Sequence, residues 1–360
     1  MSTLNHEFQE TTTFFNEAYA ADLSAVKIEE VYHVLADRIL KKWDITLVND
    51  LYAFVYTGLL KRLLQKWGKN PDSNEWHPWF AGIPMMASME PVNEMQKLAA
   101  FVHEHHLAEA IRDIHTQAEL TAFLEEYPHF EVVFNSYIES YGDRGLEELK
   151  LEMQTFRSHP LKALHQIVDS LEIPPRVERT PSENEPVPFK GWRKHVFNFL
   201  SKRARLGIQN RETSRLNRSR IYGMVRTLFN RLGMIAQTEG FIVHHDDIFW
   251  LTTDEAFDLK DYRALIAERK QAQQGFKNLP AYGYLVFKGR PYDKAVRTIE
   301  DGSTVVDTNQ WQGTPTSNGV VEGEVLVVHH PSEVRGGANG KILVTQMTDP
   351  GWVFLLTQAN

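Results

Sequence analysis

The chain has 360 residues, of which 42% are hydrophobic and 24% charged, and its formal net charge is −8. These values are typical of a soluble globular protein with one or two domains. Because the chain has no cysteine, disulfides, zinc–thiolate sites and cysteine nucleophiles are excluded. Its first residues, MSTLNHEFQE, do not form a secretory signal, and no apolar stretch approaches the ~18 residues of a membrane helix. We therefore expect a cytoplasmic protein with no membrane partner.

The charge is distributed unevenly along the sequence. Between Lys190 and Arg231 there are twelve Lys or Arg residues and one acid, Glu212, so this segment carries +11. Subtracting +11 from the total of −8 leaves −19 on the rest of the chain. The asymmetry predicts a local anionic partner. Because the chain as a whole is acidic and no nucleic-acid motif accompanies the basic segment, we expect no nucleic-acid partner.

Helical periodicity dominates the first 170 residues. Apolar residues recur at steps of three and four between 47 and 64, and again between 95 and 102, which predicts amphipathic helices. The first of these stripes consists of Leu47, Leu51, Phe54, Val55, Leu59, Leu63 and Leu64. Residues 119–127 also show a helical pattern.

Two irregular segments interrupt the helices. Between Pro78 and Pro91 the sequence PWFAGIPMMASMEP contains Met85 and Met86, whose flexible side chains suit the wall of an irregular apolar pocket. The alternative is that they fill the core under a loop. Residues 172–190 are rich in Pro and Glu, which predicts a loop or a hinge.

The second half of the chain changes from helical to strand-like periodicity. Residues 191–240 predict one long helix that stops at Gly240. Thr252 and Glu255 form the pattern of a capping box, and residues 261–276 predict a further helix. From about residue 311, the stretches VVEGEVLVVHH and KILVTQM alternate as strands do, with a turn between them.

Three groups of residues are candidates for chemistry. Arg211, Arg215 and Arg218 lie four and three positions apart, so they share one helix face and could bind phosphate, although a solvated charged face has the same pattern. The segment YGDRG at 141–145, followed by Glu148, could present Arg144 in a tight loop, or be a turn with an ion pair. His244-His245-Asp246-Asp247 has the composition of a metal site, but adjacent residues chelate one ion poorly. We therefore predict no metal site.

Several of these stretches together resemble one family, the phosphoenolpyruvate-utilising dikinases, which include phosphoenolpyruvate synthases and rifampicin phosphotransferases. YGDRGLEELKLEM resembles a Y-G-H-R-x-x-x-E segment of the rifampicin phosphotransferase middle domain, with Asp143 in place of the usual His. IPMMASMEP and the Arg211–HHDDIFWLTTDE region resemble other parts of that domain. GTPTSNGVVEGEVLVV and ILVTQMTDPGW resemble the opening of the family's mobile domain, through Gly319, Gly323, Thr348, Asp349, Pro350 and Trp352.

The resemblance implies an α+β chain with two parts. Residues 1–300 are expected to form a mostly helical domain that binds an acceptor substrate, with a loop or hinge near 172–190. Residues 301–360 are expected to begin an incomplete β-rich swivelling domain, the mobile phosphohistidine domain. Arg144, Glu148, Arg211, Arg215, Arg218, Met85 and Met86 become candidates for binding substrate or phosphate.

The reaction that the resemblance implies needs more than this chain. An ATP-grasp domain, in cis or in trans, uses ATP and Mg²⁺ to phosphorylate a histidine, which passes the phosphoryl group to a small-molecule acceptor, with release of AMP and phosphate. No ATP-grasp sequence is present, and the phosphocarrier histidine is expected beyond Asn360, so we assign no catalytic residue and expect no activity of the chain alone. Pyruvate, an antibiotic hydroxyl and another metabolite remain open as acceptors. The alternative is a non-catalytic relative that binds a ligand or a partner.

Overall fold

The structure is a computed structural model. It describes residues 2–20, 23–71, 76, 87, 89–144, 148–172, 187, 189–276, 279, 320–329, 334, 338, 340–348, 352–356 and 358–359. In this part of the chain the fold is mostly helical with two short strands, which confirms the predicted α+β class. None of the described helices combines the length and apolarity needed to cross a bilayer.

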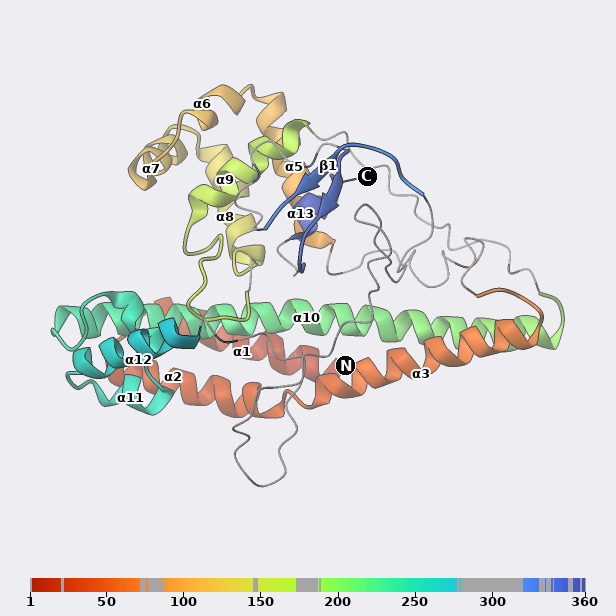
Figure 1. Cartoon of the computed structure of the whole chain (residues 1–360), viewed down its shortest axis with the longest axis horizontal. Helices are drawn as coiled ribbons and strands as arrows, with labels where there is room; N and C mark the ends of the chain where they lie inside the picture. Colours follow the sequence, from red (N-terminus) through yellow and green to blue (C-terminus); the bar gives the residue numbers. More distant parts are fainter. Residues whose placement is uncertain are drawn as a thin grey trace.

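The elements follow one another in an order that Figure 1 traces by colour. The N-terminal half contains α1 (Ser2–Ala20), α2 (Ala25–Arg38), η1 (Leu40–Lys42), α3 (Ile45–Lys66), α5 (Glu90–Glu104), α6 (Ala108–Arg112), α7 (Gln117–Glu126), α8 (Pro128–Tyr141), α9 (Pro160–Asp169) and η3 (Ser170–Glu172). The C-terminal half contains α10 (Trp192–Thr238), η4 (His245–Trp250), α11 (Thr253–Asp258), α12 (Arg263–Phe276), β1 (Val325–Val327), β2 (Ile342–Val344) and α13 (Val353–Leu356).

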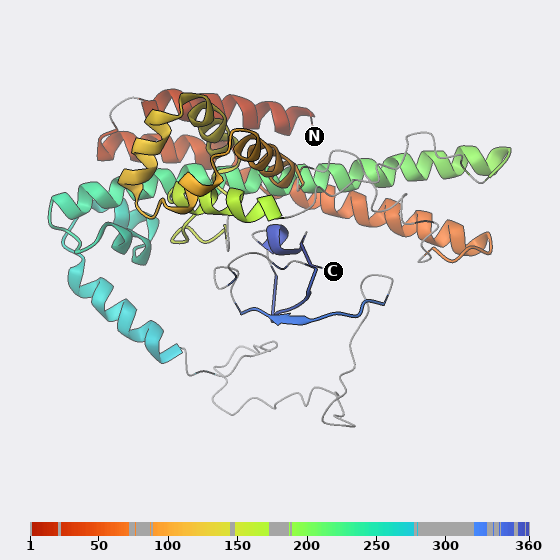
Figure 2. The same cartoon turned by 90° about the horizontal axis from the view of Figure 1, so that it is seen from above.

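Helix α10 is the axis around which the other helices are arranged (Figures 1 and 2). It has 47 residues, which corresponds to a length of about 70 Å at 1.5 Å per residue. It ends at Thr238, and two positions later Gly240 adopts a φ of 78°, a conformation that glycine tolerates best. The predicted long helix and its stop signal are therefore confirmed.

Helix α3 runs beside the first half of α10 at close range. A methyl group on Gly207 would lie 2.7 Å from the Cα of Ala53, so the two backbones approach as closely as they do only because position 207 has no side chain. Asn49 Nδ2 also donates to Ser214 Oγ at 3.1 Å. Leu60 and Leu64 are fully buried in this contact.

The remaining apolar residues of α3 correct the expectation of a buried amphipathic stripe. Leu47, Leu51, Phe54, Val55 and Leu59 are exposed, because they lie on the side of α3 that faces away from α10. The periodicity identified the helix correctly, but it could not tell which apolar side chains would find a partner.

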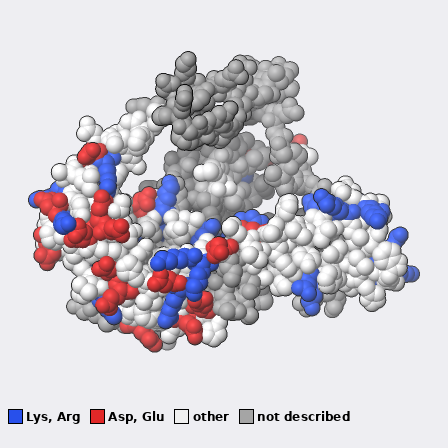
Figure 3. Space-filling view, turned by 90° about the horizontal axis from the view of Figure 1, so that it is seen from below, with Lys and Arg blue, Asp and Glu red and all other residues white. Residues whose placement is uncertain are grey.

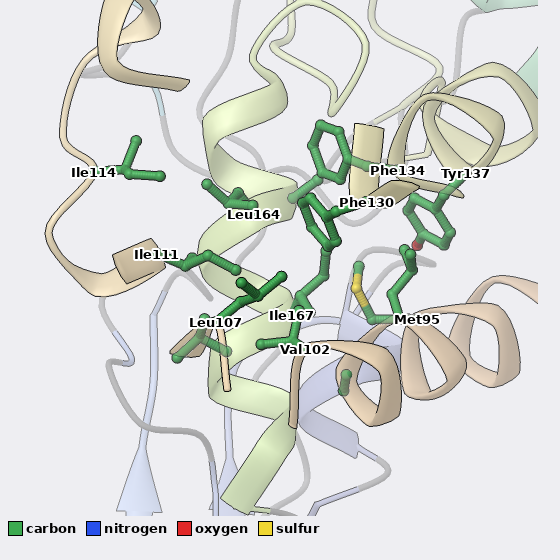
Figure 4. Packing of buried hydrophobic residues seen from close by; sticks show 14 of the residues in the cluster. Met95, Val102, Leu107, Ile111, Ile114, Phe130, Phe134, Tyr137, Leu164 and Ile167 are labelled. Carbon is green, nitrogen blue, oxygen red and sulfur yellow. The ribbon is translucent and has the colours of Figure 1, made fainter. Parts of the chain in front are cut away.

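A separate helical module, α5 to α9, packs around its own core (Figure 4). Phe130 and Phe134 stack with their ring centroids 5.6 Å apart, and Met95 and Ile167 close the core around them. The predicted helix near 119–127 appears as α7, which begins with a capping box between Thr116 and Glu119.

The second large core joins α1 and α2 to the C-terminal half of α10 and to the elements after it. Here the residues after α10 form a 3-10 helix, η4. Asp247 accepts a hydrogen bond from the His244 backbone N–H at 3.1 Å and closes a capping box, while Ile248 is buried. The apolar run 248–251 is too short for its periodicity to separate a helix from a strand.

The two strands pair in parallel, with Val325 opposite Ile342 and Val327 opposite Val344. The prediction of strands is confirmed, but parallel pairing rules out a simple hairpin turn between them. Val328, Trp352 and Leu355 form a small core against one side of the pair.

Glu255 ties three elements of the C-terminal half together. Its carboxylate accepts a hydrogen bond from the Thr252 backbone N–H at 2.8 Å, and it forms a bidentate pair with Arg269 of α12 at 2.6 and 2.8 Å. Arg269 also donates to the Trp250 carbonyl oxygen. The Arg269 and Thr252 hydrogen bonds lower the pKa of Glu255 to about 2.

We predict that Glu255→Gln lowers the melting temperature at pH 7 and that this loss is pH-dependent. The folded-state pKa is depressed, so the carboxylate stabilises the fold above its ordinary value of 4.5, and the effect disappears as pH falls toward about 2. Thermal unfolding of both proteins between these pH values checks this. A constant difference in melting temperature would contradict it.

Candidate functional site

A cavity of about 890 Å³ lies where α1, the end of α8, the segment 151–159, α10 and η4 meet. We call it the arginine cleft. Its charged and ionisable wall residues are Glu139, Asp143, Glu152, Arg157, His159, Arg220, Arg226, Arg231, His245 and Asp246. Aromatic and Met side chains complete the wall, among them Phe8, Phe15, Tyr19, Met153, Met224, Met234 and Phe249.

One stripe of α10 supplies much of the wall. Arg220, Met224, Thr227 and Arg231 follow one another at steps of four, three and four, so they lie on one helix face toward the cleft. Arg220 Nε donates to the Ser140 carbonyl oxygen at 3.3 Å, which holds its stem against the end of α8. Its guanidinium lies over the Tyr141 ring, 6.0 Å from the ring centroid.

Arg226 fixes the segment that forms the opposite wall. Its Nε donates to the Leu151 carbonyl oxygen at 3.1 Å, and its Nη2 donates to the carbonyl oxygens of Glu148 and Lys150 at 2.7 and 3.0 Å. The residue is only 3% exposed, and burial lowers the pKa of its guanidinium, against the opposing effect of Asp143. Its Nη1 is buried without a hydrogen-bond partner, which is an uncommon state for a charged donor.

Asp143 holds a second guanidinium at the cleft. Arg157 donates from Nε to Asp143 Oδ1 at 2.8 Å and from Nη2 to Oδ2 at 3.1 Å, a bidentate pair. Arg157 Nη2 also donates to the Glu139 carbonyl oxygen at 2.8 Å. The carboxyl group of Asp143 lies against Gly223 of α10, where a methyl group would overlap it, so the pair depends on that glycine.

Arg144 and Glu148 form a buried network beside the cleft. Arg144 Nη1 donates to Glu148 Oε1 at 3.0 Å and to Ser219 Oγ at 3.2 Å, and Ser219 itself donates to Glu148. Arg144 and Glu148 are buried and neither lines the described cavities. Their arrangement fits a role in joining α8 to α10. The sequence had offered either phosphate contact or an ion pair, and the structure shows the ion pair.

The three arginines singled out from the sequence lie on α10 but outside both described cavities. Arg211 Nε is 3.2 Å from Asp50 Oδ1, and Arg215 donates to Glu212 at 3.2 Å. Arg218 is partly buried, and its Nε has no hydrogen-bond partner. Arg220 and Arg231 lie on a different face of α10, and nothing in the sequence shows which face adjoins a cavity.

Several predicted site residues cannot be placed. Met85 and Met86, together with Gly319, Asp349 and Pro350 of the mobile-domain signature, lie outside the described residues. Gly323 lies just before β1, and Trp352 is buried in the small core beside the strands. The assignment of this signature to a mobile domain remains a prediction.

Sequence analysis missed His159, which lines the cleft. His159 precedes α9, and its Nδ1 lies 3.0 Å from Ser158 Oγ. Burial and Lys162 lower its pKa, whereas Asp246 of η4 raises it. The ring is therefore mostly neutral at pH 7 and can accept a proton. Single isolated histidines carry no sequence signal, so only the fold reveals this one.

A smaller cavity of about 410 Å³ lies next to the arginine cleft. Leu151, Glu152 and Phe249 line both, so the segment held by Arg226 separates them. The walls of the smaller cavity are largely apolar and include Tyr32, Val225, Phe229 and Ile248.

We predict that Arg144→Ala destabilises the protein by about 3–5 kcal/mol, because it leaves the Glu148 carboxylate buried without its cation. The double variant Arg144→Met/Glu148→Leu should recover about half of that loss, since no buried charge remains. Urea unfolding of both variants measures this. A loss below about 1 kcal/mol for Arg144→Ala would contradict the buried network.

We predict opposite shifts in the His159 pKa for two neighbouring substitutions. Asp246→Asn should lower it further, because it removes the group that raises it, and Lys162→Gln should raise it. Titration of the ring by NMR measures both shifts. If neither substitution moves the pKa, His159 does not sense the charges across the cleft.

Part of the chain resembles a known family of domains. Residues 47–212 match the family model described as the rifampicin phosphotransferase fourth domain. Two relatives, uncharacterised proteins of Mycobacterium bovis and Mycobacterium tuberculosis, are each 23% identical to the chain over 274 residues. The alignment covers 76% of this chain and 30% of each relative, so the chain spans less than a third of the length of the curated relatives it matches.

The matched range contains part of the cleft but not all of it. Asp143, Arg157 and His159 lie within 47–212, whereas Arg220 and Arg226 follow it. This match supports the resemblance seen in the sequence: residues 47–212 are similar to the fourth domain of rifampicin phosphotransferases, which belong to the phosphoenolpyruvate-utilising dikinases.

Proposed function

We propose that the arginine cleft binds the acceptor of an ATP-dependent phosphotransferase. In this proposal the phosphoryl group passes from ATP to a histidine and then to a hydroxyl of the acceptor bound in the cleft. The chain supplies the acceptor domain. ATP and Mg²⁺ are handled by an ATP-grasp domain in the same or another polypeptide.

The gathering of arginines around one cavity is the observation that carries the proposal. Arg157, Arg220 and Arg226 all line the arginine cleft, and guanidinium groups are well suited to bind the oxygens of a phosphoryl group. Together these cations can neutralise the charge on a transferring phosphoryl group, which is the main task of a protein in this type of reaction.

The size and the walls of the cleft indicate a bulky acceptor. A cavity of about 890 Å³ is large enough for a drug-sized molecule, and the aromatic and Met side chains opposite the arginines can bind an apolar body. Pyruvate would leave most of this volume empty. A large hydroxylated compound of the rifamycin type, as in the name of the matched family, fits better than a three-carbon acid.

His159 completes the chemistry. When the acceptor oxygen bonds to phosphorus and the bond from phosphorus to the donor histidine breaks, the hydroxyl proton needs an acceptor. His159 lines the cleft with a lowered pKa, so its neutral ring can take that proton. Its Nδ1 contacts Ser158 Oγ at 3.0 Å, which leaves Nε2 for the substrate.

Two arginines two positions apart on α10 provide the test. Arg220→Gln removes a cation from the cleft, whereas Arg218→Gln removes one that lies outside it. We predict that Arg220→Gln weakens pyrophosphate binding by about tenfold or more, and that Arg218→Gln changes it less than about twofold. Isothermal titration calorimetry of the 360-residue chain measures both. Equal losses would place the anion site elsewhere on the helix.

Rifampicin separates acceptor binding from anion binding. Calorimetric titration of the chain with rifampicin should show saturable binding that the Met224→Asp variant weakens, because Met224 lies in the apolar wall. Saturable binding with no phosphorylated product after addition of an ATP-grasp partner and its phosphohistidine domain would support the non-catalytic alternative. Absence of binding by both rifampicin and pyrophosphate would overturn the acceptor role.

A further inference from the structure

Helix α3 carries an apolar ridge that is exposed in the described structure. Five of its large apolar residues are more than 40% exposed on the side away from α10: Leu47, Val48, Leu51, Val55 and Leu59. Phe54, at 77%, stands beside them. A contiguous exposed patch of this kind usually marks an interaction site. We call it the α3 ridge.

The spacing of the ridge is symmetric about residue 53. Leu47 and Leu59 lie six positions before and after it, and Leu51 and Val55 lie two positions before and after it. Val48 lies five positions before it, and five positions after it stands Gly58. In an antiparallel pair of identical helices, residues at equal distances from the centre face each other. The α3 ridge therefore matches itself under a two-fold axis.

Gly58 supports a close approach at that position. A glycine in a helix interior costs about 0.5–1 kcal/mol relative to alanine, and here an added Cβ would meet no atom within 4 Å, so no neighbour in the described part of the chain requires it. Opposite the Val48 of a second copy, a bare backbone leaves room for the valine side chain. The large-against-small pairing is the kind found where helices interdigitate.

Charged residues bracket the ridge in the same symmetric way. Asp44 lies nine positions before residue 53 and Arg62 nine positions after it, and both are exposed. They continue the same face by a helical step of three from Leu47 and Leu59. In the antiparallel pair, Arg62 of each copy faces Asp44 of the other. Such exposed pairs add little affinity, but they select the orientation.

The paired helices α3 and α10 form an arm, and the charge at its outer end favours the antiparallel arrangement of two copies. Residues 57–71 and 189–211, at the outer end of this arm, carry eleven Lys or Arg and no Asp or Glu. Seen from below, the arm is largely uncharged with blue toward its outer end, and red patches gather at the opposite end of the molecule (Figure 3). Parallel pairing would bring two cationic tips together, whereas antiparallel pairing separates them.

We propose that the α3 ridge is the contact surface of an antiparallel, two-fold symmetric dimer of this chain. Each copy buries the ridge of the other, with Leu51 packed on Val55, Val48 over Gly58 and Asp44 beside Arg62. The surface is independent of the arginine cleft, since no residue of the ridge lines that cavity.

Sedimentation equilibrium of the 360-residue chain tests the proposal. The chain should dimerise between about 1 and about 100 µM, and Leu51→Lys should raise the dissociation constant by about tenfold or more. Val132→Lys is the matched control, because Val132 is 69% exposed on α8, outside the ridge. Both variants should keep the helical circular dichroism and melting behaviour of the monomer, since neither side chain is buried in it.

A charge swap tests the symmetry itself. Arg62→Asp alone should weaken the dimer a few-fold, because it places two carboxylates opposite each other at both ends of the ridge. The double variant Asp44→Arg/Arg62→Asp restores opposite charges only if position 44 faces position 62, so its dissociation constant should return to that of the parent chain. Failure of the double variant to recover would overturn the antiparallel register.

The remaining outcomes decide against a dimer. A chain that stays monomeric at about 100 µM would overturn the proposal and leave the ridge to another segment of a longer protein. Equal effects of Leu51→Lys and Val132→Lys would overturn it too, since association would then not depend on the ridge. Neither result bears on anion binding by the arginine cleft, which the Arg220→Gln variant measures separately.

Discussion

The contact on which the site depends is the clamp of Arg226 on the segment that links α8 to α9. One guanidinium donates to three carbonyl oxygens, those of Glu148, Lys150 and Leu151, in a stretch that forms no regular structure of its own. Backbone groups in such a stretch need partners when they are buried, and Arg226 supplies them from α10. The clamp thereby fixes the wall between the two cavities.

The same clamp sets the position of the neighbouring charges. With Glu148 held against α10, its side chain reaches Arg144 and Ser219, and the chain continues toward Arg157 at the mouth of the cleft. The buried pair joins the α5–α9 module to α10, while the half-buried pair of Asp143 and Arg157 faces the cavity. The buried pair of Arg144 and Glu148 is therefore structural, whereas the neighbouring pair of Asp143 and Arg157 is open to the cavity.

The features that the sequence predicted correctly depend on local interactions. The long α10, its end near Gly240, the capping box at Thr252 and the two strands all depend on residues within a few positions of one another. The arginines show where this approach fails. Arg218 and Arg220 differ by two positions on one helix, yet only Arg220 borders the cleft, because the fold decides which face of α10 meets the 151–159 segment. The apolar ridge of α3 is exposed for the same reason, because the fold decides which face of a helix is covered.

Asp143 illustrates how a departure from the family pattern can be absorbed. The resembling segment of related proteins has a histidine at this position, and the shorter carboxylate found here lies against Gly223, where no other residue type would leave room for it. A carboxylate so placed would be a costly buried anion if it were alone, but Arg157 neutralises it with two hydrogen bonds. The pair leaves a guanidinium oriented at the cleft. A histidine is a cation only when it is protonated, whereas a guanidinium is a permanent cation, so the proposed binding of an anion at this site would not depend on protonation.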